Sequence, residues 1–275
     1  MPVSEMSTHL FVGDLADPWV AAIASAIPRP RHDLPCVGDL PESWPEDARE
    51  ARVVVLHRPI LSQHDMERIQ TLRQREGPPP RVVLCAGPNV RYHQLERCST
   101  LVDVLLADAT AVEVIARHAL ELPARTPPVD PRPSVAIQSV NSDLRAMLAD
   151  ACRSAGFAVH TGDAADSPPG TLVVWDVPIL ENQWESDLRR LATRRRVVTL
   201  IGFPDRGVVH QARQAGAFAS LELPCDPLDL IFVLDRAAAA PPQRDVPPQP
   251  LGFKFARNGS SVAGHAGDSY NRNGD

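Results

Sequence analysis

The sequence predicts an α/β protein with two consecutive parallel sheets, each covered by helices. Short runs rich in β-branched residues alternate with helical patterns along the chain, and the same order of runs recurs on both sides of a proline-rich segment. The length of 275 residues fits two domains, because domains usually contain about 100–200 residues.

The first half of the chain contains four strand-like runs and three helical patterns. Strands are expected at residues 9–12, 53–57, 82–86 and 101–106. Helices are expected at residues 17–27, 62–75 and 110–120. This alternation indicates parallel strands joined by helices, so a first domain is predicted over residues 1–121.

The second half repeats the alternation with five strands and four helices. Strands are expected at residues 135–139, 157–160, 172–176, 197–201 and 217–221. Helices are expected at residues 141–155, 182–194, 207–215 and 226–238. A second domain is therefore predicted over residues 134–240.

Two proline-rich segments mark the domain boundaries. Residues 122–133 (LPARTPPVDPRP) carry five prolines, which prevent a continuous helix or a central strand, so this segment is predicted to be a linker. Residues 241–275 begin with PPQRDVPPQP and end in Gly, Ser and Asn, a composition that predicts a disordered tail. Within the tail, residues 251–255 (LGFKF) form an apolar island that could dock on a partner.

The two halves also resemble each other in sequence. VVVLHRPIL at residues 53–61 has a counterpart in LVVWDVPIL at residues 172–180. RVVLCAGPNVRYHQLERC at residues 81–98 runs parallel to RVVTLIGFPDRGVVHQARQAG at residues 196–216. Three elements recurring in one order predict a duplicated domain.

Composition excludes several classes of function. A net charge of -6 argues against nucleic acid and anionic membranes as partners. No apolar run reaches the roughly 18 residues of a membrane span, and the start lacks a signal-peptide pattern, so we expect a cytoplasmic protein. Five scattered cysteines lack the spacing of a zinc site, and Lys254 is the single lysine.

Residues 134–238 resemble the receiver domain of bacterial response regulators, which act in two-component signalling. The resemblance lies in SDLRAMLADACRSAGFAV, then LVVWDV, then QAGAFASLELPCDPLDLIFVL. The first half is similar to a more divergent copy, with FVGDLADPWVAAIA, VVVLHRPIL and VDVLLADATAVEVI in corresponding places. The resemblance implies two tandem flavodoxin-like, doubly wound parallel sheets.

Receiver chemistry needs a pair of acids and an acceptor Asp to hold Mg²⁺, plus a hydroxyl residue and a lysine that stabilise the transferred phosphoryl group. In the second half the acceptor position is Asp176. The other positions are occupied by Ser139, Val140, Gly202 and Leu223. In the first half the same five positions fall at or near Gly13, Asp14, His57, Ala86 or Gly87, and Ala107. Both copies are therefore predicted to be degenerate, with no catalytic residue, no metal and no cofactor.

The leading hypothesis is a non-enzymatic pseudo-receiver protein that acts through protein–protein interaction. In the family, the usual partner surface is the face of helix four, strand five and helix five. The resemblance therefore places a protein partner, or self-association, on the segment from Gly207 to Ala238 (residues 207–238).

Two alternatives stay open. Asp176 could be a phosphoacceptor in a remodelled site, with Asp143 or Asp205 contributing to a Mg²⁺ ion. The chain could also sense a small ligand at the carboxyl ends of the strands, which would require a sizeable apolar pocket there.

Overall fold

The computed structural model describes residues 9–45, 50–75, 77–120, 132–160, 164–179 and 183–241. Residues 122–131 of the expected linker and residues 242–275 of the expected tail lie outside the described residues. Both predicted sheets lie within them.

The first half forms one five-stranded parallel sheet in the order β2-β1-β3-β4-β5. Its strands are β1 (His9–Gly13), β2 (Arg31–Pro35), β3 (Val53–Arg58), β4 (Arg81–Ala86) and β5 (Val104–Ala107). Its helices are α1 (Pro18–Ala26), α3 (Gln63–Arg73), α4 (Tyr92–Cys98) and α5 (Asp108–Ala119).

The second half forms an equivalent sheet in the order β10-β9-β8-β6-β7. Its strands are β6 (Ser134–Gln138), β7 (Ala158–His160), β8 (Leu172–Asp176), β9 (Val197–Gly202) and β10 (Ala219–Leu223). Its helices are α6 (Ser142–Ser154), the short 3₁₀ helix η1 (Ala164–Asp166), α7 (Trp184–Ala192), α8 (Arg206–Gln214) and α9 (Pro227–Ala239). Numbered within each half, both orders read 2-1-3-4-5, which is the flavodoxin-like arrangement. The predicted fold class is confirmed.

Local sequence explains where several helices begin. The Asp17 carboxylate accepts the Trp19 N–H, and Pro18 at the first position needs no hydrogen-bond partner. Asp226 and Pro227 repeat this start at α9. These two helices thus begin where an aspartate side chain satisfies a free N–H group of the first turn.

The structure corrects several of the predicted elements. β2 was not expected, because the edge strand RHDLP is polar and mostly exposed and so lacks the apolar signal of a buried strand. The seven-residue helix α4 was also not expected. β10 begins at Ala219, two residues later than predicted, while α5 begins at Asp108, two residues earlier.

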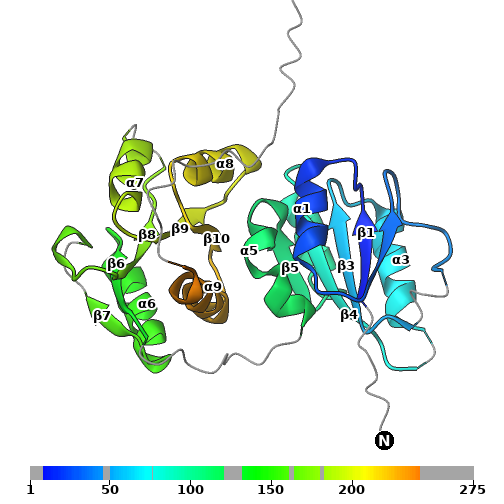
Figure 1. Cartoon of the computed structure of the whole chain (residues 1–275). Helices are drawn as coiled ribbons and strands as arrows, with labels where there is room; N and C mark the ends of the chain where they lie inside the picture. The colour runs from blue at the N-terminus through cyan, green and yellow to red at the C-terminus, as the bar shows by residue number, and fades with distance from the viewer. Residues whose placement is uncertain are drawn as a thin grey trace, which may run out of the picture.

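The two halves pack against each other through α5. Ten of its twelve residues are buried, because the helix contacts α1, β4 and β5 of its own half and α8, β10 and α9 of the second half. Figure 1 shows α5 between the two sheets. A single hydrophobic cluster contains Trp19 and Ala111 of the first half together with Val209 and Ala212 of the second. In the part of the chain that the structure describes, none of the helices is long and apolar enough to cross a membrane.

Candidate functional site

Asp176 lies at the carboxyl end of β8, as the sequence predicted, and its carboxylate is half-buried. One of its oxygens, Oδ2, accepts a hydrogen bond from the Ser139 hydroxyl at 2.7 Å. The same hydroxyl oxygen accepts the Asn141 N–H at 3.1 Å. The sequence comparison with receivers expected an acid at position 139 and an acceptor at Asp176, and the structure places the Ser139 hydroxyl as a donor to Asp176.

Asp143 and Asp205 have separate local contacts. Asp143 is exposed in the first turn of α6, where the Ser142 hydroxyl lies 3.4 Å from its Oδ1. Asp205 is the N-cap of α8 and accepts the Val208 N–H at 2.8 Å. Among the described residues, no three His, Cys, Asp or Glu side chains form a group that could hold a metal ion.

The corresponding edge of the first sheet carries a charged network that spans both halves. His57, at the end of β3, is 3% exposed, and its Nε2 lies 3.2 Å from Oδ2 of the buried Asp108. The same Asp108 oxygen accepts hydrogen bonds from Nε and Nη2 of Arg206, at 3.0 and 2.7 Å. Arg206 Nη1 donates to Asp17 Oδ2 at 2.7 Å. A guanidinium of the second half is therefore bound at the carboxyl end of the first sheet.

The pKa shifts follow from this geometry. Burial alone would raise the pKa of the Asp17 carboxyl, but the hydrogen bond from Arg206, the Trp19 and Val20 N–H groups and the Arg206 charge hold it below its usual value. Burial would lower the pKa of the Arg206 guanidinium, but the bonds and charges of Asp108 and Asp17 raise it. Both groups are therefore ionised at neutral pH.

Trp19 provides an aromatic surface for two arginines of the second half. The Arg206 and Arg213 guanidinium carbons lie 5.7 and 5.1 Å from the ring centroid, within cation–π range. The indole N–H donates to the Asp108 carbonyl oxygen at 2.9 Å. Trp19 thus ties the start of α5 to the arginine-bearing helix α8.

A second ion pair lies in the middle of the interface. Glu113 of α5 is buried and accepts two hydrogen bonds from Arg213, at 2.8 and 3.0 Å. The Ser220 N–H lies 3.3 Å from Glu113 Oε1. Burial raises the pKa of the Glu113 carboxyl, and the nearby Arg213 and Arg236 charges oppose that rise. The pair fixes α5 against β10 and α8.

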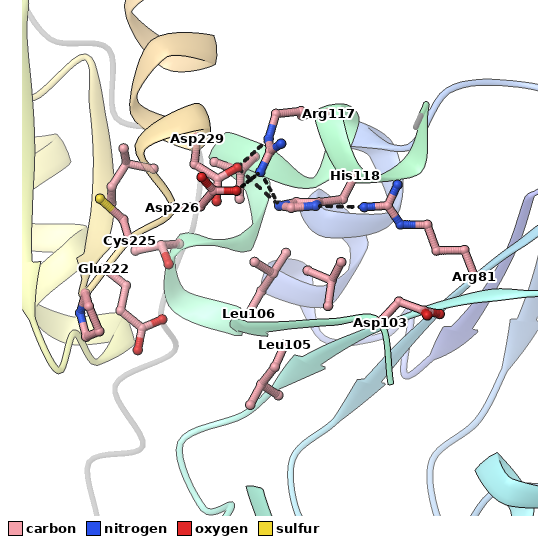
Figure 2. Close-up of a pocket in the computed structure, with 15 residues that line it drawn as sticks. Arg81, Asp103, Leu105, Leu106, Arg117, His118, Glu222, Cys225, Asp226 and Asp229 are labelled. Atoms are coloured by element: carbon pink, nitrogen blue, oxygen red, sulfur yellow. Dashed lines mark hydrogen bonds and ion pairs between the residues drawn. The ribbon is translucent and has the colours of Figure 1, made fainter. Parts of the chain in front are cut away.

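At the other end of α5 a pocket of about 340 Å³ opens between the two halves (Figure 2). On one wall Arg117 pairs with Asp226 at 2.8 Å and with Asp229 at 2.5 Å. His118 Nε2 lies 3.1 Å from Asp229, and Arg81 Nη2 lies 3.5 Å from His118 Nδ1. The wall therefore carries two arginines, one histidine and two carboxylates joined in one network of contacts.

The other pocket walls carry Glu222 and Cys225. Glu222 Oε2 accepts the Ala107 N–H at 3.3 Å, and burial raises the pKa of its carboxyl. Burial, together with the charge of Asp229, raises the pKa of the Cys225 thiol to about 11. The pocket therefore has a charged wall and an apolar part lined by Val104, Leu105, Leu106, Val114 and Leu221, and it adjoins β10 of the second sheet.

The interface uses the segment where a partner surface was expected. Residues 207–238 include most of α8, all of β10 and most of α9, and these elements contact α5 in this structure. This internal contact was not predicted from the sequence. The sequence feature that could have indicated it lies in residues 108–119. Charged side chains lie on several faces of this helix, so no single apolar stripe marks one buried side.

Comparisons with known proteins find no matching family model and no matching curated protein. Among solved structures, the chain is similar to a two-component system response regulator/GGDEF domain protein, with a TM-score of 0.35 and 16% identity over 83% of this chain and 97% of that one. It is also similar to the C-terminal part of E. coli RcsC, which contains a linker region and a phosphoreceiver domain. Here the TM-score is 0.31 and the identity is 15% over 86% of this chain and 95% of that one. Likeness at these values carries no argument about function, and the fold class rests on the strand order of the two sheets.

Proposed function

We propose that this chain is a non-catalytic signalling protein whose two receiver-like halves act as one docked unit that binds a protein partner. The observation that carries the proposal is the position of Arg206. Its guanidinium lies at the carboxyl end of the first sheet, bound to Asp17 and Asp108, where the receiver pattern would need a free acid site for a metal ion. This edge of the first half therefore binds the second half of the chain.

The bonds of the second half support the same proposal. Asp176 accepts the Ser139 hydroxyl, and Asp205 caps α8. A phosphoryl acceptor needs positive charge around the transferred group, whereas the receiver positions beside Asp176 hold Ser139, Gly202 and Leu223. We infer that Asp176 and Ser139 hold the loop after β6.

The partner surface follows from the docking. α5 already contacts α8, β10 and α9, so a second copy that used the same faces of residues 207–238 would have to displace α5. We therefore place the protein partner on surfaces outside this interface. The net charge of -6 favours a protein partner over nucleic acid or an anionic membrane.

Treatment with acetyl phosphate and Mg²⁺, followed by intact mass spectrometry, tests the non-catalytic role. We expect no phosphoryl adduct on the wild-type chain. A stoichiometric adduct that is lost in Asp176→Asn would overturn the proposal in favour of the phosphoacceptor alternative. Asp143→Asn and Asp205→Asn would then show which carboxylate contributes to the Mg²⁺ site, because the contributing residue alone would reduce labelling.

A further inference from the structure

The carboxyl edge of the second sheet presents two large apolar side chains to solvent. Val140 follows β6 and Phe203 follows β9, and each is 90% exposed. β8, which ends in Asp176, lies between these strands in the sheet. Because neighbouring strands are about 4.8 Å apart, the two side chains start about 10 Å from each other across the edge.

The backbone at Phe203 makes this exposure unusual. Its φ angle is 51°, and among the described residues it is the only non-glycine residue with a positive φ. A bulky side chain in the left-handed region is strained relative to ordinary backbone. Phe203 is nevertheless exposed in this structure, so packing does not compensate for the strained backbone. This points to a contact of Phe203 with another segment.

The charge around these two residues is negative. Asp143 and Asp205 are exposed at the same edge, and Asp176 is half-buried between them. The neighbouring Arg206 is directed into the first half, where it binds Asp17 and Asp108. Arg145, in α6, donates to the Ser139 carbonyl oxygen. A segment that fits this surface needs apolar anchors and positive charge.

We propose that residues 251–257 of this chain (LGFKFAR) dock on this edge, with the aromatic side chains against Phe203 and Val140. The segment carries Leu251, Phe253 and Phe255 as anchors. It also carries Lys254 and Arg257 and no acidic residue, so its charge complements Asp143, Asp176 and Asp205. The proposal does not depend on whether Asp176 is ever phosphorylated.

The length of the chain allows this contact. Arg196, directly before β9, donates to the Pro241 carbonyl oxygen, so the described chain ends near the amino end of the sheet. The six residues of β9 cover about 20 Å to the carboxyl edge. The nine residues 242–250 can span about 30 Å when extended. A tethered segment also has an effective concentration in the millimolar range, which makes a weak contact populated.

Photo-crosslinking in the full-length chain tests the proposal. p-Benzoylphenylalanine replaces Phe203 in one variant, Val140 in a second, and Val37 in a control. Val37 is 80% exposed after β2 of the first half. After irradiation, mass spectrometry identifies the crosslinked peptide and whether the product has the mass of one chain or two. A thermal melt of each variant shows that the fold is kept.

We expect one-chain crosslinks from positions 203 and 140 to residues 251–257. We also expect a several-fold lower yield in the double variant Lys254→Glu/Arg257→Glu, and no such crosslink from position 37. A two-chain product would overturn the proposal in favour of a second copy on this edge. The same would hold for equal yields from positions 37 and 203, or for yields that charge reversal leaves unchanged.

Discussion

Replacing Arg206 with alanine should destabilise the chain and uncouple its two halves. The guanidinium donates two hydrogen bonds to Asp108, which is 2% exposed, and one to Asp17. A hydrogen bond to a charged group contributes about 1.5–3 kcal/mol, and breaking a buried ion pair costs about 3–5 kcal/mol. The Arg206 side chain is 27% exposed, so water can partly replace it. We expect the free energy of unfolding to fall by about 2–4 kcal/mol.

Urea unfolding, followed by both tryptophan fluorescence and far-ultraviolet circular dichroism, measures this loss. The wild-type transitions should coincide if the docked halves unfold together. In Arg206→Ala each transition should broaden or divide into two steps, because the two halves would then unfold separately and both carry tryptophans, Trp19 and Trp44 in the first and Trp175 and Trp184 in the second. The double variant Arg206→Ala/Asp108→Asn should recover part of the loss, since it removes the buried charge left without its partner.

Arg189→Ala is the matched control for this variant. Arg189 pairs with Glu185 one turn earlier in α7 at 3.0 Å, and the two side chains are 57% and 38% exposed. Such exposed pairs contribute about 0.3–0.5 kcal/mol. The reasoning would be refuted if Arg206→Ala changed the free energy of unfolding by no more than Arg189→Ala does.

Three further predictions follow from the same contacts. Asp176→Asn should change the free energy of unfolding by less than about 1 kcal/mol in urea, because an amide oxygen can still accept the Ser139 hydroxyl; a larger loss would mean that the negative charge itself is needed. Cys225, with its thiol pKa of about 11, should react with iodoacetamide at pH 8 about tenfold more slowly than an unstructured cysteine. A rate equal to that of a free thiol would contradict this burial. The folded pKa of Asp17 lies below its usual 3.8, so its contribution to stability is present above that pH and is lost as the pH falls through the folded pKa. The decline in the free energy of unfolding below about pH 4 should therefore be shallower in Arg206→Ala than in the wild type. Equal slopes in urea titrations at several pH values would contradict this prediction.

The buried strands and long helices could be predicted because their signal is local. The run LVVWD marks β8 at its observed bounds, and the strand β3 differs from its prediction by a single residue. β2 escaped prediction because only its backbone joins the sheet, while His32 and Asp33 stay exposed. An apolar pattern identifies strands whose side chains are buried. It does not identify an edge strand that joins the sheet only through backbone hydrogen bonds to its neighbour.

The candidate site was only partly predictable, because its partners come from distant parts of the sequence. The position of Asp176 follows from the strand pattern, but its bond to Ser139 requires the register that places β6 beside β8. Arg206 and Asp17 are separated by 189 positions, and no local pattern joins them. A charged residue on a helix also has the same local signature whether it faces solvent, as Arg189 does, or a buried carboxylate, as Arg213 does.

The carboxyl edges of the two sheets have different roles in the contact between the halves, although the two sheets have the same strand order. In the first half the N-cap of the first helix is Asp17, and its carboxylate binds Arg206 of the other half. The corresponding N-cap in the second half is Asn141, which is neutral, exposed and bonded to N–H groups of its own helix. The contact between the halves is therefore asymmetric. In a two-fold interface each half would present the same residues to the other. At the carboxyl edge of the first sheet, Arg206 neutralises the carboxylates that it binds. The carboxyl edge of the second sheet, beside Phe203, stays acidic and is therefore the edge that a cationic segment could bind.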